Sequence, residues 1–463
     1  MMKCFVAILG RLARRPMAST ESSPVSPQHI VIVGAGFGGL YAAKALSQDP
    51  AFRVTVIDKR NYHLFQPLLY QVATGKLAPS DIATPIRHVL RGRPNVRVVQ
   101  GAAVDLDPVA RKVILNGGAE IGYDILLAAT GVKHSYFGND AWREDAPGLK
   151  TVEHALEMRQ RIFSAFEAAE LSQDPAEQAR LMTFVVVGGG PTGVELAGAI
   201  GELAQHTLKD EFRHIDTRRT RIVLAEGAPQ VLSSYPPDLA AAAERSLKKL
   251  GVEVLTRTLV THIDADGVRL KVPDGTEQVV EASTVLWAAG VRASRFGQAL
   301  ANRVQCTLDR AGKVEVNADL SLPAHPEIFV IGDLAHYAPD GAAALPGVAP
   351  VAMQQGAYVA RLLKARQRGR SLAPFRYRNQ GSMAVIGRHA AVGDLRFMHV
   401  TGITAWYLWV LVHMMGLIEF GNRVVVMTRW AWNYLTRNSG SRLITSVPEA
   451  RTGHADRAHR SRD

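Results

Sequence analysis

The chain has 463 residues, of which 47% are hydrophobic and 21% are charged. These values are typical of a globular protein with large cores, and they exclude intrinsic disorder, a collagen helix and a coiled coil for most of the length. At about 100–200 residues per domain, the length predicts two or three domains. The 54 Lys and Arg against 42 Asp and Glu give a formal net charge of +12, which suits an anionic partner such as nucleic acid or a membrane surface.

The N-terminal residues 1–28 are expected to lie outside the folded domains, as a disordered tail or a leader. Three arginines between residues 11 and 15 follow an apolar stretch at 5–9 that is too short for the core of a signal peptide. An Arg-rich leader and a later start at Met17 are the alternatives.

The first chemical motif is a glycine-rich turn between a predicted strand and a predicted helix. The β-branched run 29–33 leads into GAGFGG at residues 34–39, which contains the GxGxxG pattern. Its first glycine allows a tight turn, its second lets the backbone approach a pyrophosphate, and its third lets helix and strand pack closely. A second predicted strand ends in Asp58, 19 residues after Gly39, where a carboxylate can accept hydrogen bonds from ribose hydroxyls. These features predict a dinucleotide site.

A second unit of the same kind begins at Gly188, 154 residues after Gly34. The run 183–187 enters GGGPTG, and a later predicted strand ends in Glu226. The gap to this acid is longer than the usual ~20 residues, and the polar stretch 209–220 predicts an extended helix or an insertion. A carboxylate at this place bonds a free 2′-hydroxyl and repels a 2′-phosphate, so the sequence predicts NADH rather than NADPH.

Two dinucleotide sites in one chain indicate an enzyme that passes electrons between FAD and NAD(P)H. Three more predicted strands end in small residues, which would let a flat cofactor come close to the backbone. Their order around the two glycine-rich units predicts an α/β fold with two Rossmann-like dinucleotide-binding domains, the NAD domain being inserted in the FAD domain. The residues expected to hold FAD are Gly34, Gly36, Phe37, Gly38, Gly39, Asp58, Lys59, Thr130, Gly131, Gly332 and Asp333. Those expected to hold NADH are Gly188, Gly190, Pro191, Thr192, Gly193, Glu195, Glu226 and Gly290.

Several stretches resemble a known family. They are GAGFGGLYAAKAL, IDKRNYHLFQPLLYQVATGKL, YDILLAATGVKHSYFG, TFVVVGGGPTGVELAGAI, VLWAAGV, IFVIGDLA, LPGVAPVAMQQG and AWNYLTRNSGSRLIT, within residues 29–445. The sequence closely resembles the type II NADH:quinone oxidoreductases, which are non-proton-pumping NADH dehydrogenases with two dinucleotide-binding domains. NYHLFQPLLYQVATG and the C-terminal block are the most specific parts of the match. The resemblance implies FAD-dependent transfer of electrons from NADH to a membrane quinone.

The cysteine content limits the electron acceptor. Cys4 and Cys306 are the only cysteines, so a disulfide framework, a Cys-rich metal site and the thiol pair of disulfide reductases are excluded, and no metal is expected. Electrons must therefore pass from reduced flavin directly to a quinone, to oxygen or to another redox protein.

The C-terminal region favours a membrane quinone. Residues 397–418 contain no Asp, Glu, Lys or Arg and could just span a bilayer. Residues 422–436 place basic and aromatic side chains, such as Arg429 and Trp430, on adjacent rows at helical spacing, as in an amphipathic helix at a membrane interface. From residue 421 onward there are eight Arg and no Lys against three acids, which would attract anionic head groups.

We therefore expect peripheral attachment to the cytoplasmic side of the cell inner membrane. The alternatives are one transmembrane span near 397–418, or a buried helix with a dimer interface. Because no basic patch with interleaved stacking aromatics occurs outside this tail, nucleic acid is not an expected partner.

The resemblance also implies functional side chains. In the family a Glu at the GVE position lies near the nicotinamide, which implies a catalytic role for Glu195; a partner for the helix dipole is the alternative. The family pattern AQxAxQ of the quinone site is matched by APVAMQ at 349–354, with Pro350 in place of the first Gln, and Gln354 is expected to be catalytic. The residues expected to contact quinone are Ala352, Gln354 and Gln355. The family also makes a homodimer plausible.

The predicted domain boundaries follow the motifs. They are a tail or leader at 1–28, the first part of the FAD domain at 29–150, the NADH domain at 151–305, the second part of the FAD domain at 306–395, a C-terminal membrane-attachment region at 396–445 and a tail at 446–463. Two other functions stay open, namely a soluble NADH-dependent ferredoxin- or rubredoxin-type reductase and an NADH-sensing flavoprotein with slow turnover.

Overall fold

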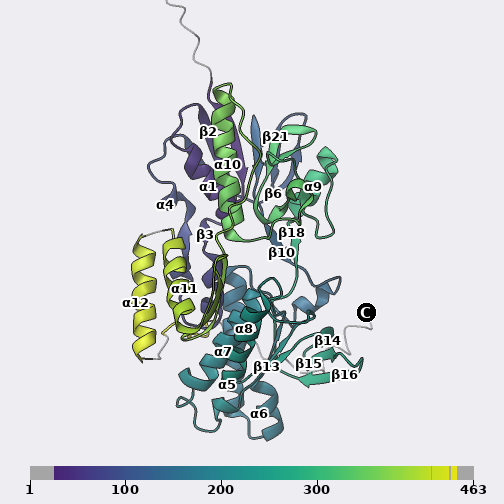
Figure 1. Ribbon diagram of the computed structural model, residues 1–463, viewed down its shortest axis with the longest axis vertical. Coiled ribbons are helices and arrows are strands. Elements are labelled where there is room, and N and C mark those ends of the chain that lie inside the picture. Colours follow the sequence, from purple (N-terminus) through teal and green to yellow (C-terminus); the bar gives the residue numbers. More distant parts are fainter. Residues whose placement is uncertain (1–25, 419, 437–439, 446–463) are drawn as a thin grey trace, which may run out of the picture.

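The computed structural model describes residues 26–418, 420–436 and 440–445. Figure 1 shows two sheet-containing lobes stacked along the long axis, with helices α11 (Gly402–Gly416) and α12 (Phe420–Thr436) on one flank. Apart from residues 26–28, the predicted tails at 1–28 and 446–463 lie outside the described residues.

The first lobe is built on a mostly parallel sheet. Its strands, in spatial order, are β20 (Ser321–Leu322), β21 (His325–Val330), β9 (Ile125–Ala128), β1 (Gln28–Val33), β2 (Phe52–Asp58) and β5 (Val96–Gln100). Ile30 and Ile32 of β1 face helices α1 (Phe37–Leu46) and α10 (Ala349–Gln367), while Val31 and Val33 face the other side. Because both faces of the strand are buried, its sequence is apolar throughout.

Smaller elements complete the first lobe. A three-stranded antiparallel sheet and a helix cover the second face of the main sheet: β6 (Ala103–Asp107), β7 (Lys112–Leu115), β8 (Glu120–Gly122) and α9 (Arg295–Val304). Short elements border it at β3 (Tyr62–Leu64), α3 (Pro79–Ile82), β4 (Ala83–Pro85), α4 (Ile86–Val89), β19 (Val314–Glu315) and β22 (Ala335–His336). Helix α2 (Leu69–Ala73), which comes from the same part of the chain, packs on helices of the second lobe.

The second lobe repeats the plan of the first. Its parallel sheet has the order β13 (Val252–Leu255), β12 (Arg221–Ala225), β11 (Thr183–Val187) and β17 (Thr284–Trp287). One face packs on α5 (Val152–Leu171), α7 (Pro191–Glu202) and α8 (Pro237–Lys249), and the other on the meander β14 (Leu259–Asp264), β15 (Gly267–Lys271) and β16 (Glu277–Glu281).

After α7 the chain makes a π turn at Leu203–Thr207, and only a short 3-10 turn at Thr217–Arg219 interrupts the polar stretch 209–220. This stretch is therefore largely an irregular insertion.

Two short strands join the lobes. The chain leaves the first lobe through β10 (Val132–His134) and returns through β18 (Val291–Ala293), and these strands pair antiparallel with each other. The second lobe is therefore inserted into the first, which confirms the predicted fold class of two Rossmann-like domains, one within the other.

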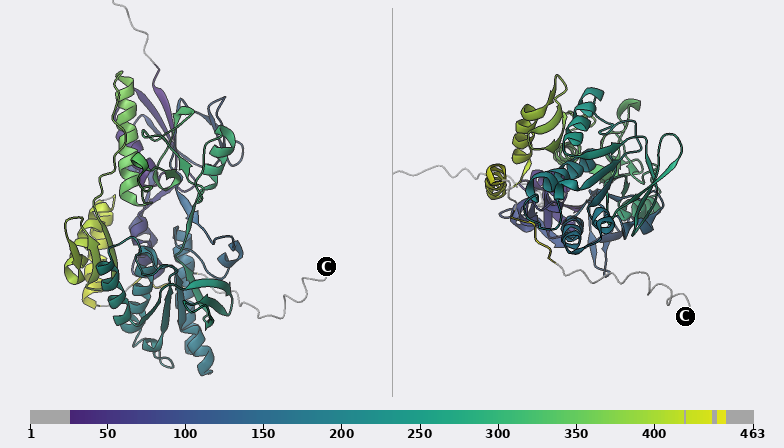
Figure 2. Two further views of the ribbon diagram at one scale, coloured as in Figure 1. Left: turned by 45° about the vertical axis from the view of Figure 1, so that its right-hand side comes forward. Right: turned by 90° about the horizontal axis from the view of Figure 1, so that it is seen from below.

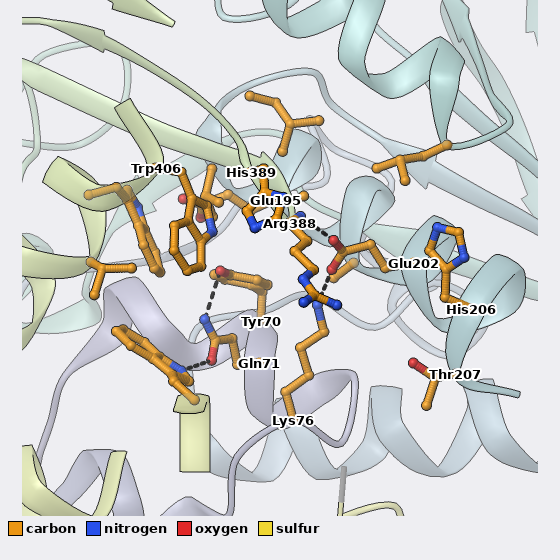
Figure 3. A pocket seen from close by; sticks show the side chains of 18 residues that line it. Tyr70, Gln71, Lys76, Glu195, Glu202, His206, Thr207, Arg388, His389 and Trp406 are labelled. Carbon is orange, nitrogen blue, oxygen red and sulfur yellow. Dashed lines mark hydrogen bonds and ion pairs between the residues drawn. The ribbon is translucent and has the colours of Figure 1, made fainter. Parts of the chain in front are cut away.

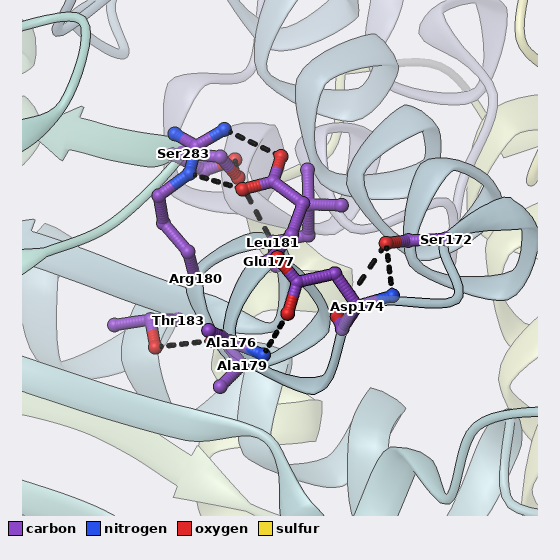
Figure 4. Close-up of polar contacts among 10 residues, drawn as sticks. Ser172, Asp174, Ala176, Glu177, Ala179, Arg180, Leu181, Thr183 and Ser283 are labelled. Atoms are coloured by element: carbon purple, nitrogen blue, oxygen red, sulfur yellow. Dashed lines mark hydrogen bonds and ion pairs between the residues drawn. The ribbon is translucent and has the colours of Figure 1, made fainter.

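Helix α6 (Pro175–Leu181) turns the chain from α5 into β11 (Figure 4). The Asp174 carboxylate caps its first turn by accepting a hydrogen bond from the Ala176 N–H at 2.9 Å. Its first residue is Pro175, which has no backbone N–H. Because an N–H at the first position of a helix has no acceptor within the helix, no hydrogen bond is lost there. At its end, the Ser283 hydroxyl donates to the Leu181 carbonyl at 3.3 Å and ties the helix to the start of β17.

The C-terminal part forms a module of its own against the second lobe. The antiparallel strands β23 (Ser382–Gly387), β24 (Ala390–Asp394) and β25 (His399–Thr401) form one sheet, which packs on α11 and α7. The strands β23 and β24, which lie before the predicted boundary at 395/396, thus associate with the C-terminal helices. Figure 2 shows α12 as the outermost helix of this flank.

The segment 397–418 is divided between two elements. Its first residues form β25, and the following helix α11 has 15 residues. In the described part of the chain, no helix combines the length and the apolar character needed to cross a bilayer.

The junction between α7 and β23 has no room for a side chain at Gly198, because a Cβ there would lie 1.8 Å from the Ile386 carbonyl oxygen. Replacing Gly198 with Ala should therefore lower the free energy of unfolding by about 1–3 kcal/mol through overpacking. Differential scanning calorimetry of the purified protein would measure the change. Gly421→Ala is the matched control, because nothing lies within 4 Å of its Cβ position. Equal unfolding temperatures for the two variants would contradict this packing.

Candidate functional site

The first glycine-rich turn is closed by backbone contacts and by Asp58. Gly34 has φ +103°, and its N–H donates to the Ile57 carbonyl at 2.7 Å. A Cβ on Gly39 would lie 1.8 Å from the Gly34 carbonyl oxygen, so helix α1 touches the turn directly. The Asp58 carboxylate at the end of β2 accepts a hydrogen bond from the Ala35 N–H at 2.7 Å. The strand end, the turn and the first turn of α1 are thereby held together.

The second glycine-rich turn repeats this arrangement. Gly188 has φ +104°, and a Cβ on Gly193 would lie 1.8 Å from the Gly188 carbonyl oxygen. The Glu226 carboxylate at the end of β12 accepts hydrogen bonds from the Gly189 N–H and, at 2.7 Å, from the Ala228 N–H. The long insertion before Glu226 does not disturb the position of this acid beside the turn.

A cavity of about 600 Å³, here called the nucleotide chamber, opens beside the first turn. The predicted FAD residues that line it are Gly34, Gly36, Phe37, Asp58, Lys59, Thr130, Gly131 and Asp333. Nothing lies within 4 Å of a Cβ position on Gly36, so the backbone is open to the chamber there. Gly38, Gly39 and Gly332 do not line it; Gly38 and Gly39 pack behind the turn.

The charge of the nucleotide chamber suits a pyrophosphate. Basic side chains on its wall outnumber acidic ones; they are Lys59, Arg60, Lys133, Arg143, Lys150, Arg292 and Arg295. The N-terminus of α1 adds N–H groups and the positive end of the helix dipole. Together with the open backbone at Gly36, the donor set and the volume fit a dinucleotide such as FAD.

Two histidines of this chamber were missed by the sequence analysis. The rings of His134 on β10 and His154 on α5 lie 5.3 Å apart. Burial and the neighbouring His154 lower the pKa of His134 to about 3, and burial also lowers the pKa of His154. Both rings are therefore neutral at pH 7 and do not repel the basic wall. No motif marks them, because their two elements meet only in the folded protein.

A second cavity, of about 390 Å³, lies where both lobes meet the C-terminal module, and we call it the C-terminal chamber (Figure 3). Its walls come from α2, α7, β23, α11 and α12. Three indole rings, those of Trp406, Trp409 and Trp430, line it together with Val385 and Ile386. The flat aromatic walls suit a planar, largely apolar ligand.

Glu195 on α7 lines the C-terminal chamber. It is 9% exposed, and burial raises the pKa of its carboxyl well above the usual range, against a hydrogen bond from the backbone of Val385. Burial therefore favours the uncharged, protonated form of this carboxyl. A buried acid with a raised pKa in a cavity is a common feature of functional sites.

The residues predicted to contact quinone on α10 lie elsewhere. Gln355 is 1% exposed, and its Oε1 accepts a hydrogen bond from the Gly332 N–H at 2.6 Å. The amide of Gln354 pairs twice with the backbone of Arg378, at 2.9 Å each. Neither glutamine nor Ala352 lines the C-terminal chamber. In this structure the two amides hold backbone segments, and their contact with quinone stays a prediction.

Comparison with known proteins identifies the family. The model of the pyridine nucleotide-disulphide oxidoreductases matches residues 28–356, and that of the NDH2 C-terminal domain matches residues 379–438. The type II NADH:quinone oxidoreductase Ndh of Mycobacterium tuberculosis is 43% identical over 93% of both chains. This chain belongs to the type II NADH:quinone oxidoreductases.

More distant relatives agree with this assignment. The type II NADH:quinone oxidoreductase of Staphylococcus haemolyticus is 29% identical, over 85% of this chain and 96% of the relative. The solved structure of NDH2 from Plasmodium falciparum in complex with NADH superimposes with a TM-score of 0.83, over 90% of this chain and 100% of that chain, at 19% identity. The latter likeness concerns the fold. The C-terminal family model begins at residue 379, close to the first strand of the C-terminal module.

The two glycine-rich turns of this type II oxidoreductase allow a matched test. Gly36 and Gly190 both have extended backbone and nothing within 4 Å of a Cβ position, so a side chain can begin at either place without a clash at its Cβ. Gly36→Val should block the approach of a pyrophosphate and yield protein without flavin. Gly190→Val should keep the flavin and slow its reduction by NADH. Flavin content after purification and rapid mixing with NADH would measure the two effects; flavin bound equally by both variants would contradict the assignment of the first turn.

Proposed function

We propose that this chain is an FAD-dependent enzyme that transfers electrons from NADH to a membrane quinone without pumping protons. The observation that carries the proposal is the pair of equivalent glycine-rich turns, each with its acid, in a chain of this family. Family membership favours this function over a soluble ferredoxin-type reductase or an NADH sensor. The balanced reaction is NADH + H⁺ + quinone → NAD⁺ + quinol.

The residues of the nucleotide chamber would bind FAD and orient it. The N–H groups at the start of α1 and the basic wall would hold the FAD pyrophosphate, and Asp58 would hold the adjoining ribose. When bound, FAD supplies the redox chemistry, accepting electrons from NADH and passing them on. Glu226 would hold the ribose of NADH and disfavour a 2′-phosphate. Half-buried Cys306 is the one cysteine among the described residues, so the proposal routes no electrons through a thiol.

The C-terminal chamber supports the quinone half of the reaction. Its indole rings match a flat head group, and the buried carboxyl of Glu195, whose pKa burial raises, is suited to hold a proton at its wall. The Gln355 side chain, bonded to Gly332, would support the FAD site from α10. Quinone contacts by Ala352 and Gln354 stay predictions from the family pattern.

The outer surface of the C-terminal module supports membrane attachment. Large apolar side chains of α11 and α12 are exposed there, among them Tyr407, Leu411, Met415, Val425, Met427 and Trp432. Large apolar side chains exposed on neighbouring helices are typical of interaction sites. We propose peripheral attachment through this face, on the cytoplasmic side of the cell inner membrane and with anionic lipids. A homodimer stays a prediction.

Rapid mixing of the purified protein, first with NADH and then with a short-chain quinone under anaerobic conditions, tests the function. NADH should decolourise the flavin, and the quinone should restore its colour within one turnover. NADPH should reduce the flavin more slowly because of Glu226. A flavin that NADH reduces but quinone does not reoxidise would point to the sensor or to a protein acceptor.

The membrane face can be tested without disturbing the core. In the variant with Val425→Asp and Met427→Asp, two exposed side chains of α12 become charged, so binding to anionic lipid vesicles should weaken by about tenfold or more. Sedimentation with vesicles would measure it. Val109→Asp is the control, since Val109 is 94% exposed on the first lobe. Unchanged binding of the α12 variant would show that another surface attaches the protein.

A further inference from the structure

Tyr70 lies at the wall of the C-terminal chamber, on the short helix α2. It is 5% exposed, and its hydroxyl takes part in a chain of hydrogen bonds that begins on α12 (Figure 3). The Trp430 indole N–H donates to Oε1 of Gln71 at 2.8 Å. The Nε2 amide of Gln71 donates to the Tyr70 hydroxyl oxygen at 2.9 Å.

The direction of these two hydrogen bonds is fixed, because an indole N–H can only donate. Trp430 therefore fixes the Gln71 amide with its oxygen toward the indole and its NH₂ toward Tyr70. The Tyr70 oxygen must then accept, and its own proton points elsewhere. Among the described residues, no protein atom accepts a hydrogen bond from this hydroxyl. A buried donor without an acceptor is costly unless a ligand or water supplies one.

A second donor of the same chamber is also without an acceptor. The Trp409 indole N–H is buried and has no hydrogen-bond partner among the described residues, and Trp409 is 2% exposed. Its ring stacks on His413 at 4.2 Å, which holds the indole in place. A flat ligand with carbonyl acceptors would complement a chamber that has aromatic walls and two buried donors. A quinone head group has this chemistry.

We propose that the Tyr70 hydroxyl donates a hydrogen bond to a carbonyl oxygen of the quinone, and that Gln71 and Trp430 are positioning residues that set its direction. The proposal rests on the proposed function and adds the side chain that recognises the acceptor. Burial raises the pKa of Tyr70 well above its usual range. The hydroxyl therefore stays protonated and acts as a donor, while the net proton of the reaction comes from elsewhere.

The arrangement also connects the acceptor site to the outermost helix. Trp430 belongs to α12, whose Arg429 forms an ion pair with the buried Asp81 at 3.2 Å. The Asn422 side chain donates to the Thr84 hydroxyl at 3.0 Å. These contacts fix α12 against the first lobe, and so they fix the indole that orients Gln71.

The test is Tyr70→Phe in the full-length flavoprotein, which removes the hydroxyl and keeps the ring. The KM for a short-chain quinone should rise about three- to tenfold, as expected for one lost hydrogen bond. Flavin reduction by NADH and electron transfer to ferricyanide, which needs no such hydrogen bond, should be unchanged. Tyr358→Phe is the matched control, because its partly buried hydroxyl donates to the Ala373 carbonyl at 2.8 Å, outside the chamber.

Two further variants, Trp430→Phe and Gln71→Leu, test the positioning role. They also test the proposal if Tyr70→Phe fails to fold. Each should raise the quinone KM by a smaller factor than Tyr70→Phe without changing reduction by NADH. A quinone KM and kcat unaltered in all folded variants would overturn the proposal. Failure of the proposed function is distinct, since the wild-type protein would then show no reduction by NADH or no reoxidation by quinone.

Discussion

The structure depends on the close approach of a helix to a strand at each glycine-rich turn. At Gly39 and at Gly193 a single added carbon would lie 1.8 Å from a carbonyl oxygen of the same turn, so no other residue fits. This contact fixes the start of the helix directly beyond the strand. The helix N–H groups, the open backbone and the acid of the neighbouring strand then converge on one point. The chain uses this solution twice, once in each lobe.

Because one lobe is inserted into the other, the two glycine-rich turns are held in one folded unit. The paired crossover strands β10 and β18 connect the lobes, and residues of both strands line the nucleotide chamber. Arg292 comes from the returning strand β18, and it lines the same chamber as Lys59 of the first lobe. The basic wall therefore combines side chains of the first lobe with side chains of the strands that connect the two lobes.

The C-terminal module gives this oxidoreductase its second cavity. Five elements meet there, and the side chains that matter come from distant parts of the chain, such as Tyr70, Glu195 and Trp430. A buried acid and a buried phenol without an acceptor lie among indole rings. The outer side of the same helices is exposed and apolar, so the surface proposed to meet the membrane is adjacent to the cavity proposed to receive a lipid-soluble acceptor.

The sequence by itself determined the local geometry. Strand, turn, helix and acid are neighbours in the chain, and the steric demands of Gly34 and Gly39 are local, so the two dinucleotide units, the fold class and the family followed from the residues. The tertiary structure alone decided which side chains share a cavity. Gln354 matches a family pattern, yet its amide is bonded to the backbone of Arg378, and the partners of Gln71 and His134 follow no sequence period. Hydrogen-bond direction and burial depend on atoms brought together from distant segments, and sequence spacing carries no information on those.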